Sequence, residues 1–458
     1  MITDTIAAIS SAMSPSGIGI IRISGPDSMD VIARIYKSKN GKKQIDKVDS
    51  HTIHYGFIMD DEILIDEALV MIMKGPRTYT GEDTVEINCH GGVLSMKKVL
   101  ETVIKHGARV AEPGEFTKRA FLNGKLDLSQ AEAVMDVISA KSEYALKSSL
   151  SQLKGSVQKS ITSIREKIIY HIAYIESALD DPEHISVDGY GDTLMLDMEP
   201  LKREIEHLLK SADEGKMIHE GIKTVILGKP NAGKSSLLNI LVGEERAIVT
   251  DIAGTTRDIL EEQIMLQGIS LRMIDTAGIR DTEDTVEKIG VDKAKAYAQD
   301  ADLILYVVDA SVPLDDNDKD IIGLLKEKKA IVLLNKSDLH AVVDEAVLKE
   351  FVDAPILWIS AKEEKGITEL EDTIKRLFFT GEINFNDEVY ITNVRHKTAL
   401  VEAKKSLELV MNSIDMGMPE DFFTIDLMSA YESLGTIIGE SVGEDLVNEI
   451  FSKFCTGK

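Results

Sequence analysis

Apolar residues follow two different periods along this chain. In the first 118 residues, short alternating runs recur between Gly-Pro and Gly-Gly pairs. That pattern is typical of β-strands separated by turns. We expect strands at residues 17–23, 51–58, 68–73 and 84–88. The pattern predicts a mixed α+β N-terminal domain over residues 1–118.

A helical period then replaces the strand pattern. Ser129 and Glu132 have the spacing of a capping box at the start of a periodic segment. An amphipathic stripe follows and ends before Asp181 and Pro182. Its members are Ile161, Ile164, Ile168, Ile172, Ile175 and Leu179. We interpret this stripe as the core of a helical bundle.

The helical period resumes near Thr398 and runs to the end of the chain. A last apolar face is formed by Val447, Ile450, Phe451 and Phe454. The simplest interpretation is one α-helical domain built from two chain segments, residues 119–215 and 381–458.

Between these segments, residues 216–380 alternate apolar runs with helical patterns. Three of the runs cover residues 303–308, 330–334 and 355–359. Such alternation predicts a doubly wound parallel sheet. We therefore expect a multidomain α/β protein with a nucleotide-binding domain inserted into the helical domain.

Length and composition indicate the number of domains and the cellular compartment. A length of 458 residues suggests about three domains. The two cysteines, Cys89 and Cys455, are far apart, which argues against a disulfide framework and for a reducing compartment. Neither a signal-peptide pattern at Met1 nor an apolar stretch near eighteen residues is present, so we expect a cytoplasmic protein without a membrane span.

The formal charge of −26 is the strongest compositional signal. A surface this acidic repels a polyanion and loses the counterion-release contribution to nucleic-acid affinity. If an RNA is the substrate, we expect a basic partner to make most of the contact.

A phosphate-binding loop stands at residues 228–235, which read Gly-Lys-Pro-Asn-Ala-Gly-Lys-Ser between an apolar run and a helical segment. Backbone N–H groups and the helix N-terminus would bind the phosphates. Lys234 would reach the β and γ oxygens, and the Ser235 hydroxyl would hold Mg²⁺.

The other elements of a GTP site follow in order. Asp275 begins Asp-Thr-Ala-Gly, whose acid suits a water-mediated Mg²⁺ contact, and Thr256 is the candidate switch ligand. Asp338 can accept two hydrogen bonds from guanine, a donor pair that adenine lacks. Residues 360–362 would back the base. The predicted nucleotide contacts are Asn231, Ala232, Gly233, Lys234, Ser235, Ser236, Thr250, Asp251, Ile252, Ala253, Gly254, Thr255, Thr256, Asp275, Thr276, Ala277, Gly278, Asn335, Lys336, Asp338, Ser360, Ala361 and Lys362.

Two departures from Ras-like enzymes bear on mechanism. Ile279 stands where those enzymes place the glutamine that orients water. Asn231 could turn its amide oxygen to a monovalent cation near the phosphates, and residues 250–256 could surround the same ion. Such a cation would do the work of an arginine finger. Two alternatives remain: Asn231 stabilises the loop as a turn residue, or Ile279 marks a slow GTPase.

The whole chain resembles the MnmE (TrmE) family of tRNA modification GTPases. Besides the nucleotide motifs, the blocks at residues 19–25, 79–92, 113–128 and 454–458 carry this resemblance. The family commonly has an aliphatic residue in place of Thr456. The resemblance implies a homodimer formed by the N-terminal domains, with nucleotide domains that pair when GTP and K⁺ bind.

The resemblance also implies roles for single residues. Potassium ligands would be Asn231, Thr250, Ile252 (through its carbonyl) and Thr255. Magnesium ligands would be Ser235 and Thr256. Glu287 would help to orient the attacking water, so that Glu287, Asn231 and Thr256 form the catalytic set. Without the resemblance, Glu287 is more simply a solvated carboxylate on a helix.

In the N-terminal domain the resemblance implies a site for 5-formyl- or 5,10-methylene-tetrahydrofolate. Its ligands would be Arg22, Glu86, Lys125 and Lys458. Glu86 can accept from a pterin amino–amide edge, and the cations can bind carboxylates. Considered one at a time, each of these charged side chains is more simply explained as a surface residue. Cys455 could be a functional nucleophile or a small apolar residue, which the sequence leaves open.

The leading functional expectation is GTP hydrolysis coupled to a carboxymethylaminomethyl or aminomethyl addition at C5 of the wobble uridine (position 34) of certain tRNAs. The resemblance implies a complex with an FAD-dependent MnmG-like protein that holds most of the tRNA. An alternative is a ribosome-assembly or regulatory GTPase of the Era or Der type, although no basic RNA-binding domain is evident. In a third alternative, the N-terminal domain is a dimerisation scaffold without folate.

Overall fold

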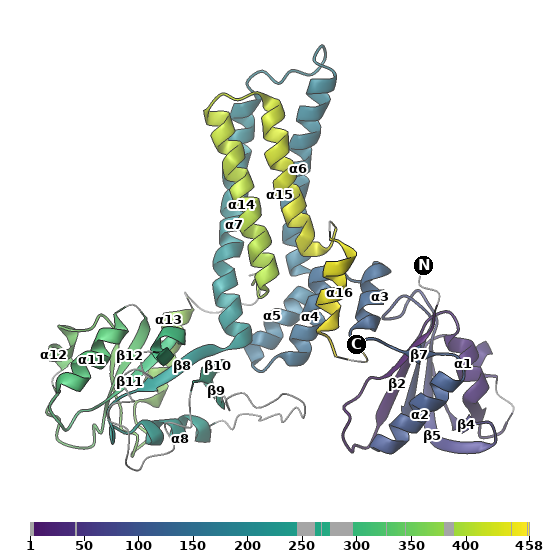
Figure 1. Cartoon of the computed structure of the whole chain (residues 1–458), viewed down its shortest axis with the longest axis horizontal. Helices are drawn as coiled ribbons and strands as arrows, with labels where there is room; N and C mark the ends of the chain where they lie inside the picture. The colour runs from purple at the N-terminus through teal and green to yellow at the C-terminus, as the bar shows by residue number, and fades with distance from the viewer. Residues whose placement is uncertain are drawn as a thin grey trace. The chain divides into compact units, whose positions relative to one another are not determined.

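The structure is a computed structural model of the chain. It describes residues 4–41, 44–244, 262–266, 268–274, 296–326, 328–343, 345–379, 389–440, 442–455 and 457. The chain divides into two compact units (Figure 1). The first contains Met1–Met135, Gln152–Met198 and Glu402–Lys458, and the second contains Asp136–Ser151 and Glu199–Val401.

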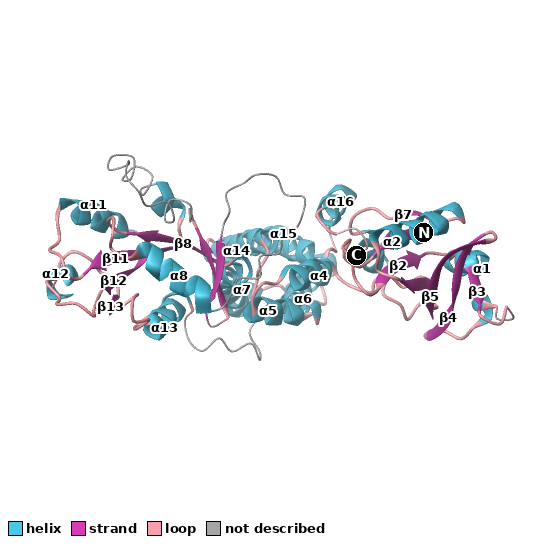
Figure 2. Cartoon of the chain, turned by 90° about the horizontal axis from the view of Figure 1, so that it is seen from below, coloured by secondary structure: helices cyan, strands magenta, loops and turns pink. Residues whose placement is uncertain are grey.

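The first unit begins with a seven-stranded sheet in the order β3-β4-β5-β6-β2-β1-β7 (Figure 2). Every neighbouring pair is antiparallel except β1 and β7. The strands are β1 (Ile6–Ile9), β2 (Gly19–Ser24), β3 (Tyr36–Ser38), β4 (Thr52–Asp60), β5 (Ile63–Met73), β6 (Thr84–Cys89) and β7 (Arg109–Val110). The four predicted strands correspond to β2, β4, β5 and β6, and the three missed strands are short.

One face of this sheet is covered by α1 (Ser28–Ile35) and α2 (Val93–Lys105), and η1 (Ile45–Lys47) is a short 3-10 turn. The helices bury Ile32 and Val99 against Ile21 and Val70 of the strands. Fully buried aliphatic side chains contribute about 1.5–3 kcal/mol each. This face is therefore the core of the N-terminal part.

The helical part of the first unit contains α3 (Glu115–Leu122), α6 (Ser156–Asp180), α15 (Glu420–Ile438) and α16 (Glu444–Ser452). The predicted isoleucine stripe lies on α6 and is buried. The prediction is wrong for the last member of the stripe, because Leu179 is 45% exposed and the neighbouring Ala178 takes the buried position. Arg165 of α6 bonds the carbonyl oxygen of Tyr431 on α15 at 3.2 Å. The two helices are thus joined by polar as well as apolar contacts.

The predicted capping box at Ser129 and Glu132 is wrong, because the helix α4 (Leu128–Ser139) begins earlier. Asp127 accepts the N–H of Gln130 at 3.1 Å, and the Gln130 side chain accepts the N–H of Asp127 at 3.1 Å. Ser129 donates its hydroxyl to Asp127 at 2.5 Å. The reciprocal cap therefore forms two residues upstream, since Asp127 has the better acceptor.

The predicted C-terminal apolar face is confirmed. Val447, Phe451 and Phe454 are buried with Leu128 and Ala131 of α4. The backbone of α16 comes very close to Gly114, where an added Cβ would lie 2.6 Å from the carbonyl oxygen of Phe451. A residue larger than glycine cannot be placed there without displacing backbone.

The second unit contains a six-stranded sheet in the order β13-β12-β11-β8-β10-β9. Its strands are β8 (Ile222–Leu227), β9 (Glu262–Leu266), β10 (Ile269–Met273), β11 (Leu303–Asp309), β12 (Lys329–Asn335) and β13 (Ile356–Trp358). All pairs are parallel except β9 and β10. Its helices are α8 (Lys234–Glu244), α11 (Asp316–Leu325), α12 (Glu345–Lys349) and α13 (Ile367–Phe378).

Helices cover both faces of this sheet. Leu305 of β11 faces the core that contains α8 and α13, whereas Ile304 and Tyr306 face the core that contains α11 and α12. Strands buried on both faces read as nearly continuous apolar runs. The predicted doubly wound domain within a multidomain α/β protein is confirmed.

The limits between the two units fall within four helices: α4, α5 (Glu143–Leu153), α7 (Tyr190–Glu220) and α14 (Val394–Asp415). The predicted domain boundaries at residues 118, 215 and 380 stay predictions. No helix in the described ranges has the length and apolar composition that a membrane span requires.

Candidate functional site

The phosphate loop joins β8 to α8 through backbone angles that favour glycine. Gly228 has φ +152° and Gly233 has φ +103°. A Cβ at Gly228 would overlap the carbonyl oxygen of Val307, and one at Gly233 would overlap the Asn335 amide. Asn231 also adopts positive φ, at 62°, which asparagine tolerates better than most residues. The loop is therefore fitted closely against the carboxyl ends of the neighbouring strands.

Lys234, the first residue of α8, crosses back over this loop. Its Nζ donates to the carbonyl oxygens of Gly228 at 2.8 Å and Lys229 at 2.7 Å. An ammonium has three protons, so one remains for a phosphate oxygen. Burial lowers the Lys234 pKa, and a bound phosphate would favour its charged form. Ser235 follows at half-buried depth, and Ser236 is exposed.

A single buried amide connects the phosphate loop to the predicted base-binding loops. Asn335, at the end of β12, is 2% exposed. Its Nδ2 donates to the carbonyl oxygen of Ala232 at 2.8 Å, and its Oδ1 accepts the N–H of Ala361 at 3.0 Å. Removing this side chain would leave two buried backbone groups unpaired, at about 1–3 kcal/mol each.

Asp338 and Lys336, two predicted base-site residues that follow Asn335, are also held in place. The Ser360 hydroxyl donates to Asp338 Oδ1 at 2.9 Å. Lys336 has φ 64° and pairs with Asp309 at the end of β11. Burial raises the Asp309 pKa, but hydrogen bonds from Lys336 and Ser311 outweigh it and hold that pKa low. Lys362 is exposed at the rim.

Several predicted site residues lie outside the described residues. They are Thr250, Asp251, Ile252, Ala253, Gly254, Thr255, Thr256, Asp275, Thr276, Ala277, Gly278, Ile279, Glu287 and Lys458. The structure therefore brings together the phosphate-loop and base-loop residues, while the predicted switch, water-orienting and terminal residues stay predictions.

Sequence reasoning missed the contacts of Lys229, the second residue of the phosphate loop. Its Nζ lies 2.6 Å from Asp318 and 3.1 Å from Asp315. Burial lowers the Lys229 pKa, but these two carboxylates raise it by more. A lysine inside a glycine loop was the available signal, but nothing local pointed to an acid about 90 residues away.

The predicted folate ligands Arg22 and Glu86 face each other across β2 and β6. The Arg22 Nε donates to Glu86 Oε1 at 2.9 Å. The Arg22 guanidinium also lies 5.6 Å from the ring centroids of both Tyr79 and Phe116. The partly exposed Tyr79 ring offers a flat aromatic surface beside a paired charge, whereas Phe116 is fully buried. The two rings were not among the predicted ligands.

The chain terminus reaches the same sheet within this unit. Gly457 accepts hydrogen bonds from Ser10 at 3.0 Å and from Arg22 at 3.4 Å through its carbonyl oxygen. Lys125 instead donates to the carbonyl oxygen of Pro76 at 3.0 Å. Arg22 and Glu86 are thus brought together with the terminal segment, and no contact from Lys125 to this pair is found among the described residues.

The two cysteines differ in their surroundings. Cys455 is exposed, and its carbonyl oxygen accepts the N–H of Gly114 at 3.3 Å. Cys89 is buried, and burial raises its pKa to about 11. An exposed thiol can meet a substrate and a buried one cannot, so Cys455 remains the candidate functional thiol.

One acidic cluster has the composition of a metal site. Ligand atoms of Asp60, Asp61 and His106 lie within 4.8 Å of one another. Lys105 already donates to the two carboxylates, at 2.7 and 3.3 Å. A lysine therefore supplies the positive charge that an ion would bring.

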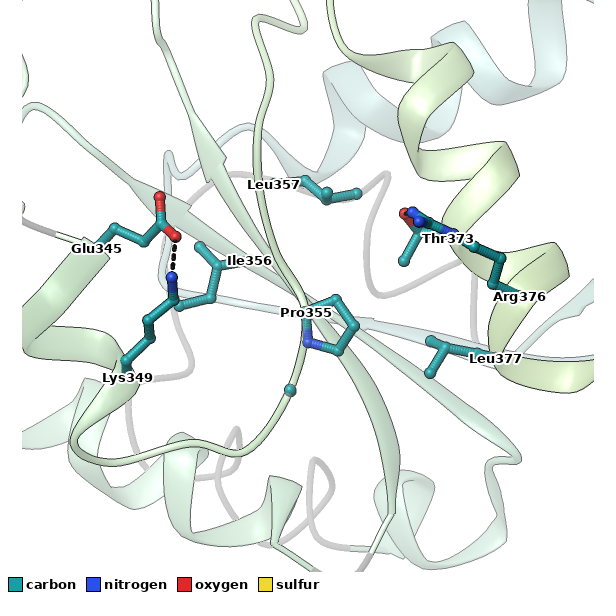
Figure 3. A pocket seen from close by; sticks show the side chains of 9 residues that line it. Glu345, Lys349, Pro355, Ile356, Leu357, Thr373, Arg376 and Leu377 are labelled. Carbon is teal, nitrogen blue, oxygen red and sulfur yellow. Dashed lines mark hydrogen bonds and ion pairs between the residues drawn. The ribbon is translucent and has the colours of Figure 1, made fainter.

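An open hollow of about 490 Å³ lies beside β13 in the second unit (Figure 3). Pro355, Ile356 and Leu357 line it along the strand, and Thr373 and Arg376 line it from α13. It lies at the beginning of β13, whereas Asn335 is the last residue of β12 and Ser360 follows the end of β13. The hollow is therefore not part of the nucleotide site.

Comparison with known proteins identifies the family of the chain. The chain matches family models described as "GTP-binding protein TrmE N-terminus" over residues 5–125 and "MnmE helical domain" over residues 128–455. It is 60% identical to the tRNA modification GTPase MnmE of Lachnoclostridium phytofermentans, and 49% identical to that of Clostridioides difficile. Each alignment covers 100% of both chains.

Among solved structures, the G domain of the T. maritima FeoB iron transporter aligns with 34% of this chain and 97% of that chain. The identity is 21% and the TM-score is 0.25, which is too low to carry an argument. The family models and the full-length relatives show that the chain belongs to the MnmE (TrmE) family of tRNA modification GTPases.

Proposed function

We propose that this chain hydrolyses GTP and couples that reaction to modification of the wobble uridine (position 34) of certain tRNAs. The product would be a carboxymethylaminomethyl or aminomethyl group at C5. The observation that carries the nucleotide part is the buried Asn335 amide, which joins Ala232 of the phosphate loop to Ala361. Phosphate and base sites built as one unit suit a nucleoside triphosphate.

The residues divide the work of binding. Lys234 directs its remaining proton to the β and γ oxygens, while Asp338 accepts from guanine and so excludes adenine. Ser235, at the start of α8, supplies the hydroxyl that would hold Mg²⁺, with Thr256 as the second protein ligand. When bound, Mg²⁺ neutralises charge on the phosphates.

Asn231 fits the proposed potassium site. Its side chain is exposed beside the loop, and within the described ranges its amide oxygen has no hydrogen-bond partner. Neutral oxygens replace the hydration shell of K⁺. Thr250, Ile252 and Thr255 would complete the ligands, and bound K⁺ would neutralise the charge that develops between the β and γ phosphates.

Steady-state GTP turnover in equimolar KCl and NaCl tests this part. We expect turnover to be at least about tenfold faster in K⁺ and this preference to vanish in Asn231→Ala. Asn239→Ala, at an exposed asparagine of α8 outside the predicted site, is the matched control. Equal rates in the two salts would show that the cation proposal is wrong, while leaving GTP hydrolysis in place.

The folate part of the proposal rests on the Arg22–Glu86 pair and the Tyr79 ring beside it. Glu86 would accept from a pterin edge, and Arg22, Lys125 and Lys458 would orient the cofactor. The Tyr79 ring offers a stacking surface. A tetrahydrofolate bound here would donate the one-carbon unit.

Calorimetry with 5-formyltetrahydrofolate tests the pocket without any tRNA. Binding to the wild type should be lost in Glu86→Gln, since the amide replaces one of the two acceptor oxygens by an NH₂ donor that would face a pterin donor. It should persist in Glu101→Gln, an exposed control on α2. Wild type without heat of binding would support the alternative of a scaffold that needs no folate.

We place this chain in the cytoplasm as a homodimer in complex with an FAD-dependent MnmG-like protein. The charge of −26 supports a division of labour in which that partner holds most of the tRNA. Nucleoside analysis of tRNA from cells that lack the chain is the direct test. Unchanged wobble uridines, together with co-fractionation of the chain with ribosomal subunits, would favour the Era or Der type of function.

A further inference from the structure

A buried carboxylate lies behind the phosphate loop in the second unit. Asp318 of α11 is 1% exposed, and both of its oxygens are engaged. Oδ1 accepts the Tyr306 hydroxyl proton at 2.7 Å. Oδ2 accepts the N–H of Asp315 at 2.9 Å and lies 2.6 Å from the Lys229 ammonium. A carboxylate this deep is tolerable only with such partners.

The surroundings fix the position of this carboxylate. Tyr306 projects from the central strand β11 and is fully buried. Asp315 and Asp318 form the capping box that begins α11, so the Asp318 backbone is held as well. Asp318 is therefore attached to the sheet and to the helix end, which are two rigid elements of the domain.

Lys229 is engaged at both ends. Its side chain, 21% exposed, reaches Asp318, while its carbonyl oxygen accepts a hydrogen bond from Lys234 Nζ at 2.7 Å. The same ammonium bonds the Gly228 carbonyl oxygen at 2.8 Å. A continuous path of contacts thus runs from Tyr306 through Asp318 and Lys229 to the phosphate lysine.

We propose that Lys229 and Asp318 are positioning residues for phosphate binding, with Asp318 anchoring the part of the loop whose carbonyl orients the Lys234 ammonium. The proposal rests on the proposed GTP function and adds to it. Tyr306 supports the anchor from the sheet. Without the anchor, the Lys229 carbonyl is free to shift, and Lys234 loses the fixed direction of its remaining proton.

Two other effects of these residues predict different results. Simple charge attraction predicts that Asp318→Asn strengthens phosphate binding, because a negative charge near an anion disappears. General loss of fold predicts that phosphorylated and unphosphorylated ligands weaken together. Positioning of Lys234 predicts that phosphate-dependent affinity alone falls.

The experiment titrates the full-length chain with GDP and with guanosine in Mg²⁺. The ratio of the guanosine Kd to the GDP Kd isolates the phosphate contribution. The variants are Lys229→Met, Asp318→Asn, their double variant, and Lys229→Arg as the conservative replacement. Lys319→Met is the matched control, since Lys319 pairs with Asp316 on the same helix but is exposed.

We expect the ratio to fall about tenfold in Lys229→Met and in Asp318→Asn, equivalent to about 1.4 kcal/mol. The double variant should lose no more than either single variant, because both act through one path. Lys229→Arg and Lys319→Met should stay within about twofold of the wild type.

An unchanged or raised ratio in Asp318→Asn, or additive losses in the double variant, would overturn the proposal. If Asp318→Asn fails to fold, Lys229→Met is the deciding variant, and an unchanged ratio of the guanosine Kd to the GDP Kd in that variant overturns the proposal. A wild-type chain that binds neither ligand would overturn the GTP function along with the anchor. Tight GDP binding with unaffected ratios would overturn the anchor only.

Discussion

Replacing Asp338 by asparagine should change the base that the site accepts. Guanine presents two donors, N1–H and the exocyclic amine, and the Asp338 carboxylate can accept both. Xanthine presents N1–H and a carbonyl oxygen in place of the amine. An asparagine amide can accept the first and donate to the second. Ser360 donates to Oδ1 at 2.9 Å, so the amide oxygen can retain that contact while Nδ2 turns to the base.

The magnitude follows from the hydrogen bonds that are exchanged. A hydrogen bond to a charged group contributes about 1.5–3 kcal/mol, and an unpaired donor adds a penalty of about 1–3 kcal/mol. Asp338→Asn should therefore weaken GDP by about 3 kcal/mol, or roughly 100-fold. Xanthosine diphosphate should gain affinity by a comparable factor.

Calorimetric titration of the wild type and Asp338→Asn with both diphosphates measures this exchange. Asp316→Asn, whose side chain is 95% exposed at the start of α11, is the control and should leave both affinities unchanged. If Asp338→Asn weakens both diphosphates equally, or neither, then Asp338 does not contact the base and the assignment of GTP from this residue is refuted.

Three further predictions concern stability and thiol chemistry. Arg119 is fully buried among three carboxylates, so its replacement by methionine should lower the free energy of unfolding by about 3–5 kcal/mol. Urea denaturation measures this loss, and a loss below about 1 kcal/mol would contradict the prediction. Burial lowers the His171 pKa, so the unfolded chain binds the proton more readily and stability should fall as pH drops below about 6.5. His171→Gln should lose less stability than the wild type between pH 7 and 5, and an equal loss would exclude this group. At pH 8 a thiol reagent should label Cys455 but not Cys89, whose pKa is raised to about 11; mass spectrometry that found both labelled in the native chain would be contrary evidence.

Much of the nucleotide site could be predicted because its chemistry is local in sequence. The glycine loop follows the apolar strand β8, Asn335 ends β12 and Asp338 comes shortly after it, and parallel strands bring their carboxyl ends to one edge. The strands of the N-terminal sheet were predicted for a similar reason, since β2 and β6 alternate clearly. Short strands such as β7 offer too few residues for a period to be visible.

Contacts between distant charges could not be predicted. With 78 acidic residues in the chain, nothing in sequence selects Asp318 as the partner of Lys229. The same limit applies to the rings beside Arg22, because the fold and not the sequence order places them there. The prediction of the α4 cap was wrong for a local reason. Both Asp127 and Ser129 can begin a helix, and Asp127, the stronger acceptor, forms the cap.

The most direct test of the central claim is a titration of the wild-type chain with GDP and with ADP in Mg²⁺ and K⁺. The Asn335 bridge and the Asp338 carboxylate predict that GDP binds at least about 100-fold more tightly than ADP, since adenine leaves the half-buried Asp338 acceptor unpaired. Equal affinities, or no binding of either nucleotide, would contradict the claim that these residues form a guanine nucleotide site.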